Sequence, residues 1–210
     1  MDYAIIRNMA ISTDLPTDGR IQRSERSRTA IVQALLELIG EGSVSPTAQQ
    51  VAERADVGVR TVFRHFSDME TLFSTMNDQL NAEVASLFVE KVQTGSFEDR
   101  VDALIERRMT IFGKLAPYVR SSTIQRWRSA FLQAEHERTI RVLRRDLRRW
   151  LPEIESASTE VADALEMILS FEAWNRLRVD QRLSLRRTAL VLHRSILDLT
   201  ALTRAQMSTP

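Results

Sequence analysis

Residues 46–72 read PTAQQVAERADVGVRTVFRHFSDMETL, and this stretch decides how the first part of the chain folds. Thr47 is a favoured residue for capping a helix that begins at the next position. The apolar residues of that helix repeat at helical spacing as Val51, Ala52 and Ala55. The spacing stops at residues 56–58 and restarts at Val59. The stretch therefore predicts two short helices joined by a turn, as in a helix-turn-helix.

The second helix of this pair separates apolar from polar side chains. Helical spacing turns Val62, Phe63 and Phe66 inward and leaves the polar set outside, namely Arg60, Thr61, Arg64 and His65. An α-helix fits the major groove of DNA, where an arginine can bond a guanine edge with two parallel hydrogen bonds or hold a phosphate. The outer face therefore favours DNA binding, although pairs of short amphipathic helices also occur in helical proteins that bind no DNA.

The segment from about Ser24 to Leu72 resembles the N-terminal DNA-binding domain of the TetR family of bacterial transcriptional regulators. That family has a first helix that ends near a glycine, then a threonine, an alanine, a valine-containing turn, a Thr-Leu-Tyr-x-His-Phe run, a lysine and a leucine. The corresponding residues here are Gly42, Thr47, Ala52, Val57, the run Thr61-Val62-Phe63-Arg64-His65-Phe66, Met69 and Leu72. The resemblance implies an all-α protein in which a three-helix DNA-binding domain precedes a larger helical domain for ligand binding and dimerisation.

The resemblance also implies which side chains approach DNA. They are Thr47 and Gln49 on the second helix and Val59, Arg60, Thr61, Phe63, Arg64 and His65 on the third. Three positions depart from the family. Phe63 lacks the phenolic hydroxyl of the usual tyrosine, Met69 replaces a lysine expected near a phosphate, and Gly58 replaces a residue that often caps the recognition helix. We expect fewer phosphate contacts, while the helix still forms because glycine is a tolerated cap.

The composition of all 210 residues favours helices throughout. Glycine and proline are sparse, and apolar residues recur at spacings of three and four without strand-like alternation. We predict helices near residues 24–41, 47–54, 58–65, 68–92, 98–114, 117–133, 135–150, 159–178 and 184–203, with breaks at Gly95-Ser96, Pro117, Pro152 and Leu183-Ser184. The predicted domains are a flexible tail over 1–22, the DNA-binding domain over 23–72, and a helical effector-binding and dimerisation domain over 73–205.

Charge is nearly balanced, with a net charge of +1. DNA binding must therefore rest on local arginines and not on a general positive field. Besides Arg60 and Arg64, the candidates are four arginines that precede or open the first long helix: Arg20, Arg23, Arg26 and Arg28. These four could touch phosphate or the minor groove, and they could equally form a solvated helix start.

The second domain contains large side chains that could face one another across its helices. The resemblance implies a pocket for a small-molecule effector of unknown identity, for which we name Met109, Phe112, Trp127, Phe131, Met167, Phe171 and Trp174. Aromatic residues at helical spacing more often simply fill a core. An effector that prefers a conformation with misplaced recognition helices would release DNA by a population shift.

The last two predicted helices have broad apolar faces. The resemblance implies that they pair with a second copy as a four-helix bundle, through Leu165, Ile168, Leu169, Leu190, His193, Ile196 and Leu197. A palindromic operator also requires two readers about 34–36 Å apart. The other possibility is that one chain absorbs both faces.

A run of basic residues occupies one predicted helix, at Arg138, Arg141, Arg144, Arg145, Arg148 and Arg149. It is typical of a solvated face, and an anionic ligand is the alternative. The chain has no cysteine, no apolar span of about 18 residues and no glycine-rich phosphate loop. We therefore expect no membrane span, metal, cofactor or enzymatic activity. The sequence predicts a cytoplasmic, homodimeric repressor, and the alternative is a helical interaction or ligand-binding protein that no longer reads DNA.

Overall fold

The computed structural model describes residues 18–89 and 95–207, and the side chains of 19–85 and 95–201. Over these ranges the chain is helical and has no strand, which confirms the all-α fold. The elements are α1 (Asp18–Gly40), α2 (Ala48–Arg54), α3 (Val59–His65), α4 (Met69–Val89), α5 (Phe97–Gln125), η1 (Arg126–Arg128), α6 (Ala130–Trp150), η2 (Pro152–Ser156), α7 (Thr159–Ile168), α8 (Phe171–Asn175), η3 (Arg176–Asp180) and α9 (Leu185–Met207).

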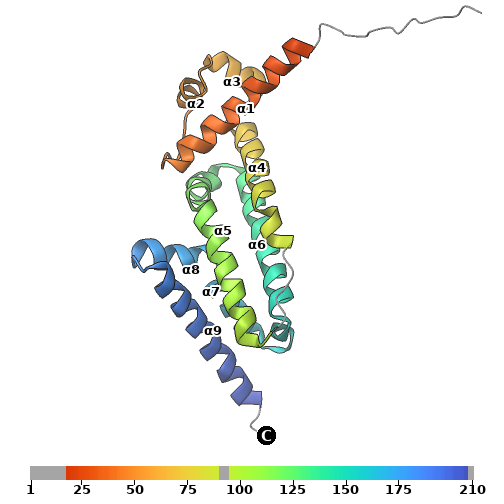
Figure 1. Ribbon diagram of the computed structural model, residues 1–210, viewed down its shortest axis with the longest axis vertical. Helices are drawn as coiled ribbons and strands as arrows, with labels where there is room; N and C mark the ends of the chain where they lie inside the picture. The colour runs from red at the N-terminus through yellow and green to blue at the C-terminus, as the bar shows by residue number, and fades with distance from the viewer. Residues whose placement is uncertain (1–17, 90–94, 208–210) are drawn as a thin grey trace, which may run out of the picture.

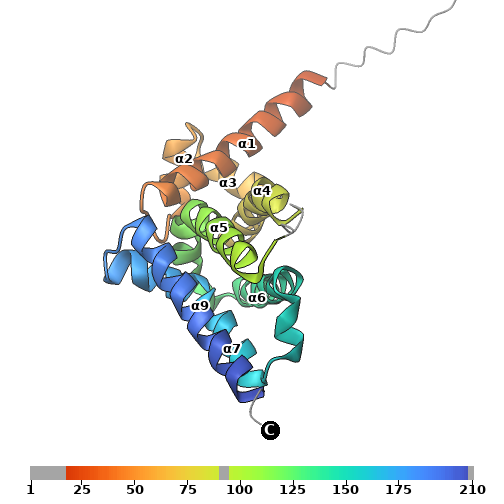
Figure 2. The ribbon, with the colours of Figure 1, turned by 60° about the horizontal axis from the view of Figure 1, so that its bottom comes forward.

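The helices form an elongated molecule with two parts. Helices α1 to α3 lie together at one end, and α4 leads from them into the bundle formed by α5 to α9 (Figure 1). A second view shows α7 and α9 side by side along the bundle (Figure 2), and these two helices pack against each other and, through α9, against α5. Within the described residues, no helix is both long and apolar enough to span a bilayer.

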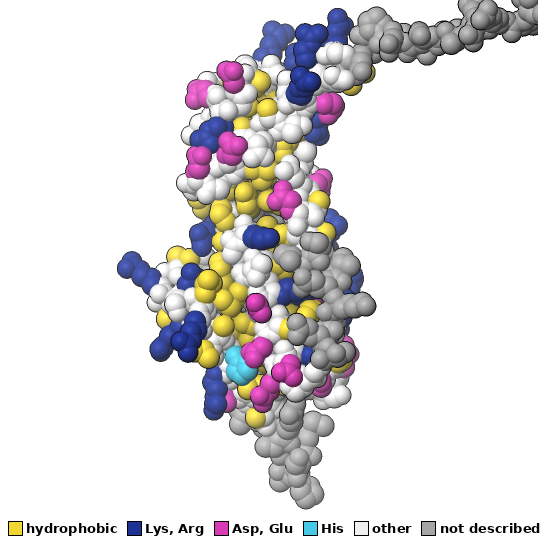
Figure 3. All heavy atoms as spheres, viewed as in Figure 1, with side chains coloured by type: hydrophobic (Ala, Val, Ile, Leu, Met, Phe, Trp, Pro, Cys, Tyr) yellow, Lys and Arg dark blue, Asp and Glu magenta, His cyan; other side chains and the backbone are white. Residues whose placement is uncertain are grey.

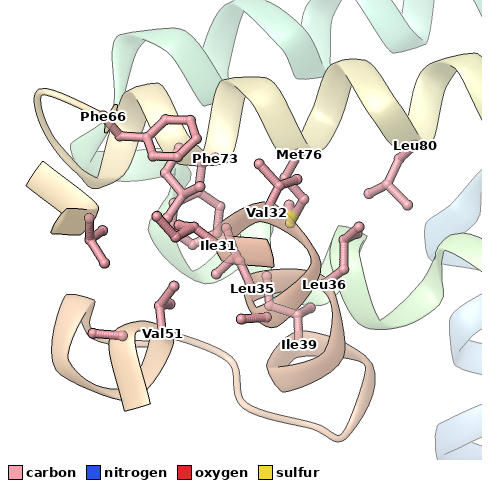
Figure 4. Packing of buried hydrophobic residues seen from close by; sticks show 14 residues of the cluster. Ile31, Val32, Leu35, Leu36, Ile39, Val51, Phe66, Phe73, Met76 and Leu80 are labelled. Atoms are coloured by element: carbon pink, nitrogen blue, oxygen red, sulfur yellow. The ribbon is translucent and has the colours of Figure 1, made fainter. Parts of the chain in front are cut away.

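The core of the first part joins all four of its helices. Ile31 and Leu35 of α1 point toward Val51 of α2, Phe66 beyond α3 and Phe73 of α4 (Figure 4). Each of these side chains is at most 5% exposed. Burying one large apolar side chain contributes about 1.5–3 kcal/mol, so this shared core fixes α3 relative to α1 and α4.

Local signals place the ends of these short helices as predicted. Thr47 caps α2 in a capping box with Gln50. Gly58 is the N-cap of α3 and provides no side-chain hydrogen bond. Between them Asp56 adopts the left-handed conformation at φ 52°, which a short aspartate tolerates. After α1, Gly42 has φ 104°, a value that favours glycine. The predicted helix-turn-helix is thus confirmed in its geometry.

Three boundaries differ from the prediction. The predicted break at Pro117 is wrong, because α5 continues through this proline to Gln125 with buried residues on both sides of it. The next helix begins at Ala130, where the Ser129 hydroxyl accepts a bond from the Leu132 N–H. The single helix predicted over 159–178 is divided, since Ser170 caps a new helix by accepting from the Ala173 N–H.

The N-terminal boundary also differs. Helix α1 begins at Asp18, so residues 18–22, predicted as the end of a flexible tail, are helical. Residues 1–17 of that predicted tail lie outside the described residues, as do 90–92 of the predicted fourth helix. The predicted breaks before α5 and α9 are confirmed by the caps Ser96 and Ser184.

Candidate nucleic-acid interface and ligand cavity

Helix α3 presents a polar face to solvent. Arg60 and Arg64 are exposed and lie one turn apart, while Val59 and Thr61 are half-buried. Val62 is buried beneath them. Nothing within the described residues hydrogen-bonds or ion-pairs with either guanidinium of this face, which leaves both free to contact a ligand.

The prediction that Phe63 faces inward is wrong, because its side chain is 47% exposed. Val62 and Phe66 are one turn apart and take the inward positions. Phe63 is one residue past Val62, about 100° further round the helix, and therefore emerges beside the two arginines.

Helix α2 uses its polar side chains within the domain. The Thr47 hydroxyl accepts from the Gln50 N–H at 3.2 Å, and Gln49 Nε2 donates to Glu53 at 2.7 Å. Arg54 forms two hydrogen bonds to Glu41, which lower the pKa of that carboxyl. Thr47 and Gln49 are both exposed, but each already holds a bond inside the protein.

His65 occupies the end of α3 as a half-buried imidazole. Burial lowers its pKa below 6.5, and the nearby positive charges of Arg64 and Arg28 lower it further, against Glu25, which raises it. Its Nε2 is buried and has no hydrogen-bond partner in the described chain. The lowered pKa favours the neutral form of the ring.

Arg28, the last of the four arginines at the start of α1, contacts both the end of α3 and α4. Its guanidinium lies 4.7 Å over the ring of Phe66 and 3.5 Å from the Thr75 hydroxyl on α4. It is half-buried. The other three arginines of this group, Arg20, Arg23 and Arg26, are exposed.

A cavity of about 400 Å³ lies between α4, α5, α6 and the start of α8. This size fits a drug-sized ligand. Of the seven predicted pocket residues, Phe112 and Phe171 line the cavity. Trp174 does not line the cavity but packs against both rings, with its ring centroid 6.0 Å from that of Phe112 and 5.6 Å from that of Phe171.

The other four predicted pocket residues do not line the cavity. Trp127 is 79% exposed, because α5 ends before it and η1 turns it outward. Met167 is 65% exposed, since the inward face of α7 is taken by Leu165. Met109 packs into the core, and the half-buried Phe131 lies outside the cavity.

Sequence reasoning missed the contribution of α4 to the cavity. Phe73, Met76 and Leu80 line it and also belong to the core of the first domain. The sequence already predicts that this helix spans the boundary between the two domains, and its apolar spacing was the signal that could have placed these residues at the cavity.

Most charged groups of the cavity wall are already bonded within the protein. Arg108 is 3% exposed and donates to the carbonyls of Leu143 at 2.7 Å and Leu169 at 3.3 Å. Desolvation lowers the pKa of Arg108 to about 10, although Asp146 opposes that shift. Glu135 accepts a hydrogen bond from Asn77 at 2.8 Å, and Glu166 accepts two from Arg144 at 2.6 and 3.0 Å. The cavity therefore offers mainly apolar surface.

The predicted dimer residues divide into two groups. Leu165, Leu169 and Ile196 are at most 2% exposed within one chain, so the prediction that they form an interface is wrong. They pack in the core that joins α5, α7 and α9. Ile168 and Leu197 are half-buried, and the His193 ring bonds to Asp102 on α5. Leu190, at 58% exposed, faces solvent.

The arginine run on α6 is a paired, solvated face. Four of its members contact carboxylates: Arg138 with Glu135, Arg141 with Glu137, Arg144 with Glu166 and Arg148 with Glu155. These contacts favour the solvated face over an anionic ligand. Among the described residues, no three histidine or acidic side chains are grouped so that they could hold a metal ion.

Comparison with known proteins agrees with this geometry. Residues 31–76 match the family described as bacterial regulatory proteins, tetR family. The fold is similar to the crystal structure of a transcriptional regulator from Rhodococcus sp. Rha1, with a TM-score of 0.62 and 18% sequence identity over 84% of this chain and 95% of that chain. At this identity the likeness shows the fold alone. None of the curated proteins matches this chain in sequence.

Proposed function

We propose that this chain, whose N-terminal domain belongs to the TetR family of bacterial regulatory proteins, is a cytoplasmic repressor that binds a palindromic operator as a homodimer. A small molecule in the cavity would release it. The family match covers the buried part of α1, the helix pair α2–α3 and the start of α4.

One observation carries the DNA-binding part of the proposal. Arg60 and Arg64 are exposed on one face of α3 without partners in the described chain, whereas Arg54 is held by Glu41. Free guanidinium groups on a rigid helix can reach base edges and phosphates, since no internal bond has to break first. Phe63 beside them offers an apolar surface for a thymine methyl.

The outer face of α9 supports the dimer. Leu190 is 58% exposed there, and a shallow groove beside it is lined by Arg187, Leu190, Val191, Arg194 and Ser195. Two copies joined through this face would supply the two readers that a palindromic operator requires.

The shared residues of α4 support effector control. Phe73, Met76 and Leu80 touch both the cavity and the core that positions α3. A ligand that moved α4 would therefore move the recognition helix. Since the charged groups of the wall are largely bonded internally, we propose a mainly apolar effector. Coupling of 1–3 kcal/mol is typical, and DNA would weaken effector binding by the same factor.

Selection of bound duplexes from a random pool tests the DNA-binding proposal. We expect the wild-type protein to enrich a palindrome, and Arg60→Ala/Arg64→Ala to lose about 100-fold or more in affinity for it, because each bidentate contact contributes about 1–3 kcal/mol. Arg141→Ala/Arg145→Ala on α6 is the matched control and should bind normally.

Sedimentation should show the same oligomer for all three proteins. Sequence-specific binding that survives in the α3 double variant would refute the site. A wild-type protein without preference for any duplex would refute DNA reading altogether and leave a helical ligand-binding protein.

A further inference from the structure

The first turns of α1 extend beyond the core of the molecule. Every residue from Gly19 to Arg26 is exposed, and the first buried residue of this helix is Ile31. Two views show this part of α1 projecting past α3 (Figures 1 and 2). It continues a helix that is already nucleated in the core, so each added residue gains a backbone bond without a new nucleation cost.

The projecting turns carry a basic side. Arg20, Arg23 and Arg26 follow one another at intervals of three residues, which places them within about a third of the helix circumference. Glu25 lies away from this sector. Arg20 and Arg26 have no hydrogen-bond or ion-pair partner in the described chain, and Arg23 Nε donates only to the Gly19 carbonyl at 2.9 Å. The three charges are available to an anion.

These turns emerge at the end of the molecule that presents α3. Arg28 lies over Phe66, the residue that ends α3, and both Arg28 and Glu25 act electrostatically on His65. Helix α1 therefore passes the C-terminal end of the recognition helix and then continues outward. The space-filling view shows basic side chains gathered at this end, over α3 and the start of α1 (Figure 3), and all of them are arginines because α1 to α4 hold no lysine.

We infer that the projecting turns of α1 are a second DNA contact, in which Arg20, Arg23 and Arg26 bind backbone phosphates that flank the groove read by α3. The inference rests on the proposed function and extends it to DNA outside the half-sites. From residue 20 to residue 26 the helix rises about 9 Å, and a duplex carries a charge about every 1.7 Å along its axis. Several phosphates therefore lie within reach, and contacts to them carry no base information.

Salt titration of Arg20→Ala/Arg23→Ala/Arg26→Ala tests this inference. The probe is the duplex enriched by the wild-type protein, in one form with long flanks and in another trimmed to the half-sites. Alanine is the best helix former, so the exposed helix should persist. On the long duplex we expect the slope of log affinity against log salt to become shallower by about 2–5, because each neutralised phosphate contributes about 0.9 and a dimer has six such arginines.

Three comparisons decide the outcome. On the trimmed duplex the difference between wild type and variant should largely disappear, and Arg20→Lys/Arg23→Lys/Arg26→Lys should keep a steep slope on the long one. The matched triple Arg141→Ala/Arg145→Ala/Arg148→Ala removes equal charge from α6 and should leave the slope unchanged.

A wild-type slope in the α1 triple alanine variant would overturn this inference while the proposed function stands. An equal loss in the α6 triple would also overturn it, since net charge would then be the cause. If the wild-type protein bound no duplex, both would fall.

Discussion

The two parts of this molecule place their polar side chains in opposite ways. The core shared by α1, α2, α3 and the start of α4 is entirely apolar, and the charges of these helices lie outside. All the buried polar and charged residues found in the described chain belong to the second part: Arg107, Arg108, Ser121, Asp146 and Thr188. The second part also encloses the cavity.

The difference fits two tasks. A close-packed apolar core holds α3 in one position, so its outward side chains form a fixed surface. An interior with a cavity can accept a ligand. Its hydrogen-bonded charged groups can then exchange bonds within the protein for bonds to that ligand. Helix α4 belongs to both parts, because Phe73 and Met76 touch the apolar core on one side and the cavity on the other. Substitutions in each interior should therefore have different effects on stability.

The largest effect is expected from Asp146→Asn. This side chain is 5% exposed and faces both Arg107 and Arg108, at 3.3 Å from the latter. Removing its charge leaves buried guanidinium groups without their anion, which costs about 3–5 kcal/mol of unfolding free energy in urea titration. Glu155→Gln, at an exposed pair with Arg148, should change it by less than about 0.5 kcal/mol. A loss below about 1 kcal/mol in Asp146→Asn would contradict a buried ionic centre.

Leu35→Ala should weaken the apolar core of the first part. The side chain is fully buried, and its truncation should cost about 2–4 kcal/mol by cavity formation. The folded variant should still bind the selected duplex with wild-type affinity, since α3 keeps its outer face. Leu38→Ala, at a half-buried position, is the control and should cost less. A cost below about 1 kcal/mol would mean that this core is as adaptable as the hollow second part.

Thr47→Ala removes the side-chain cap of α2. We expect a loss of about 1 kcal/mol in thermal or urea unfolding, because the Gln50 N–H loses its acceptor. Thr47→Ser keeps a hydroxyl and should restore most of the stability. If the serine variant is as unstable as the alanine variant, the cap is not the source of the effect.

The smallest effect concerns His65 on α3 and His136 at the cavity wall. Burial lowers the pKa of both below 6.5, so the unfolded chain binds protons more readily than the folded one. Their contribution to stability is complete above pH 6.5 and is lost as pH falls below it. His65→Gln should reduce the fall in unfolding free energy between pH 7.5 and 5.5, and His136→Gln should do so separately. An unchanged fall in either variant would contradict that assignment.

Local patterns made the first part predictable. The effects of Thr47, Gly42 and the apolar spacing around Val62 depend only on residues within one or two helical turns. They can therefore be recognised directly in the sequence. The same holds for the cap Ser184. Phe63 was misplaced because three apolar candidates, Val62, Phe63 and Phe66, competed for two inward positions on α3, and only the packing of the first core decided between them.

The residues that line the cavity and the exposed face of α9 could not be predicted from local patterns. Helical spacing identifies an apolar side chain on a face of its helix but does not show which other helix covers that face. Met167 and Trp127 therefore resemble pocket residues in sequence and are exposed in the fold, while Leu165 resembles an interface residue and is buried within its own chain.

By itself the sequence determined the helical class, the helix-turn-helix and the free arginines of α3, because capping and periodicity are short-range properties of the backbone and its side chains. Tertiary structure alone decided that α5 continues through Pro117, that Phe73, Met76 and Leu80 of α4 line the cavity, and which aromatic residues surround it. Those outcomes depend on which surfaces meet when distant helices pack, and the energy of that packing is shared among residues far apart in the chain.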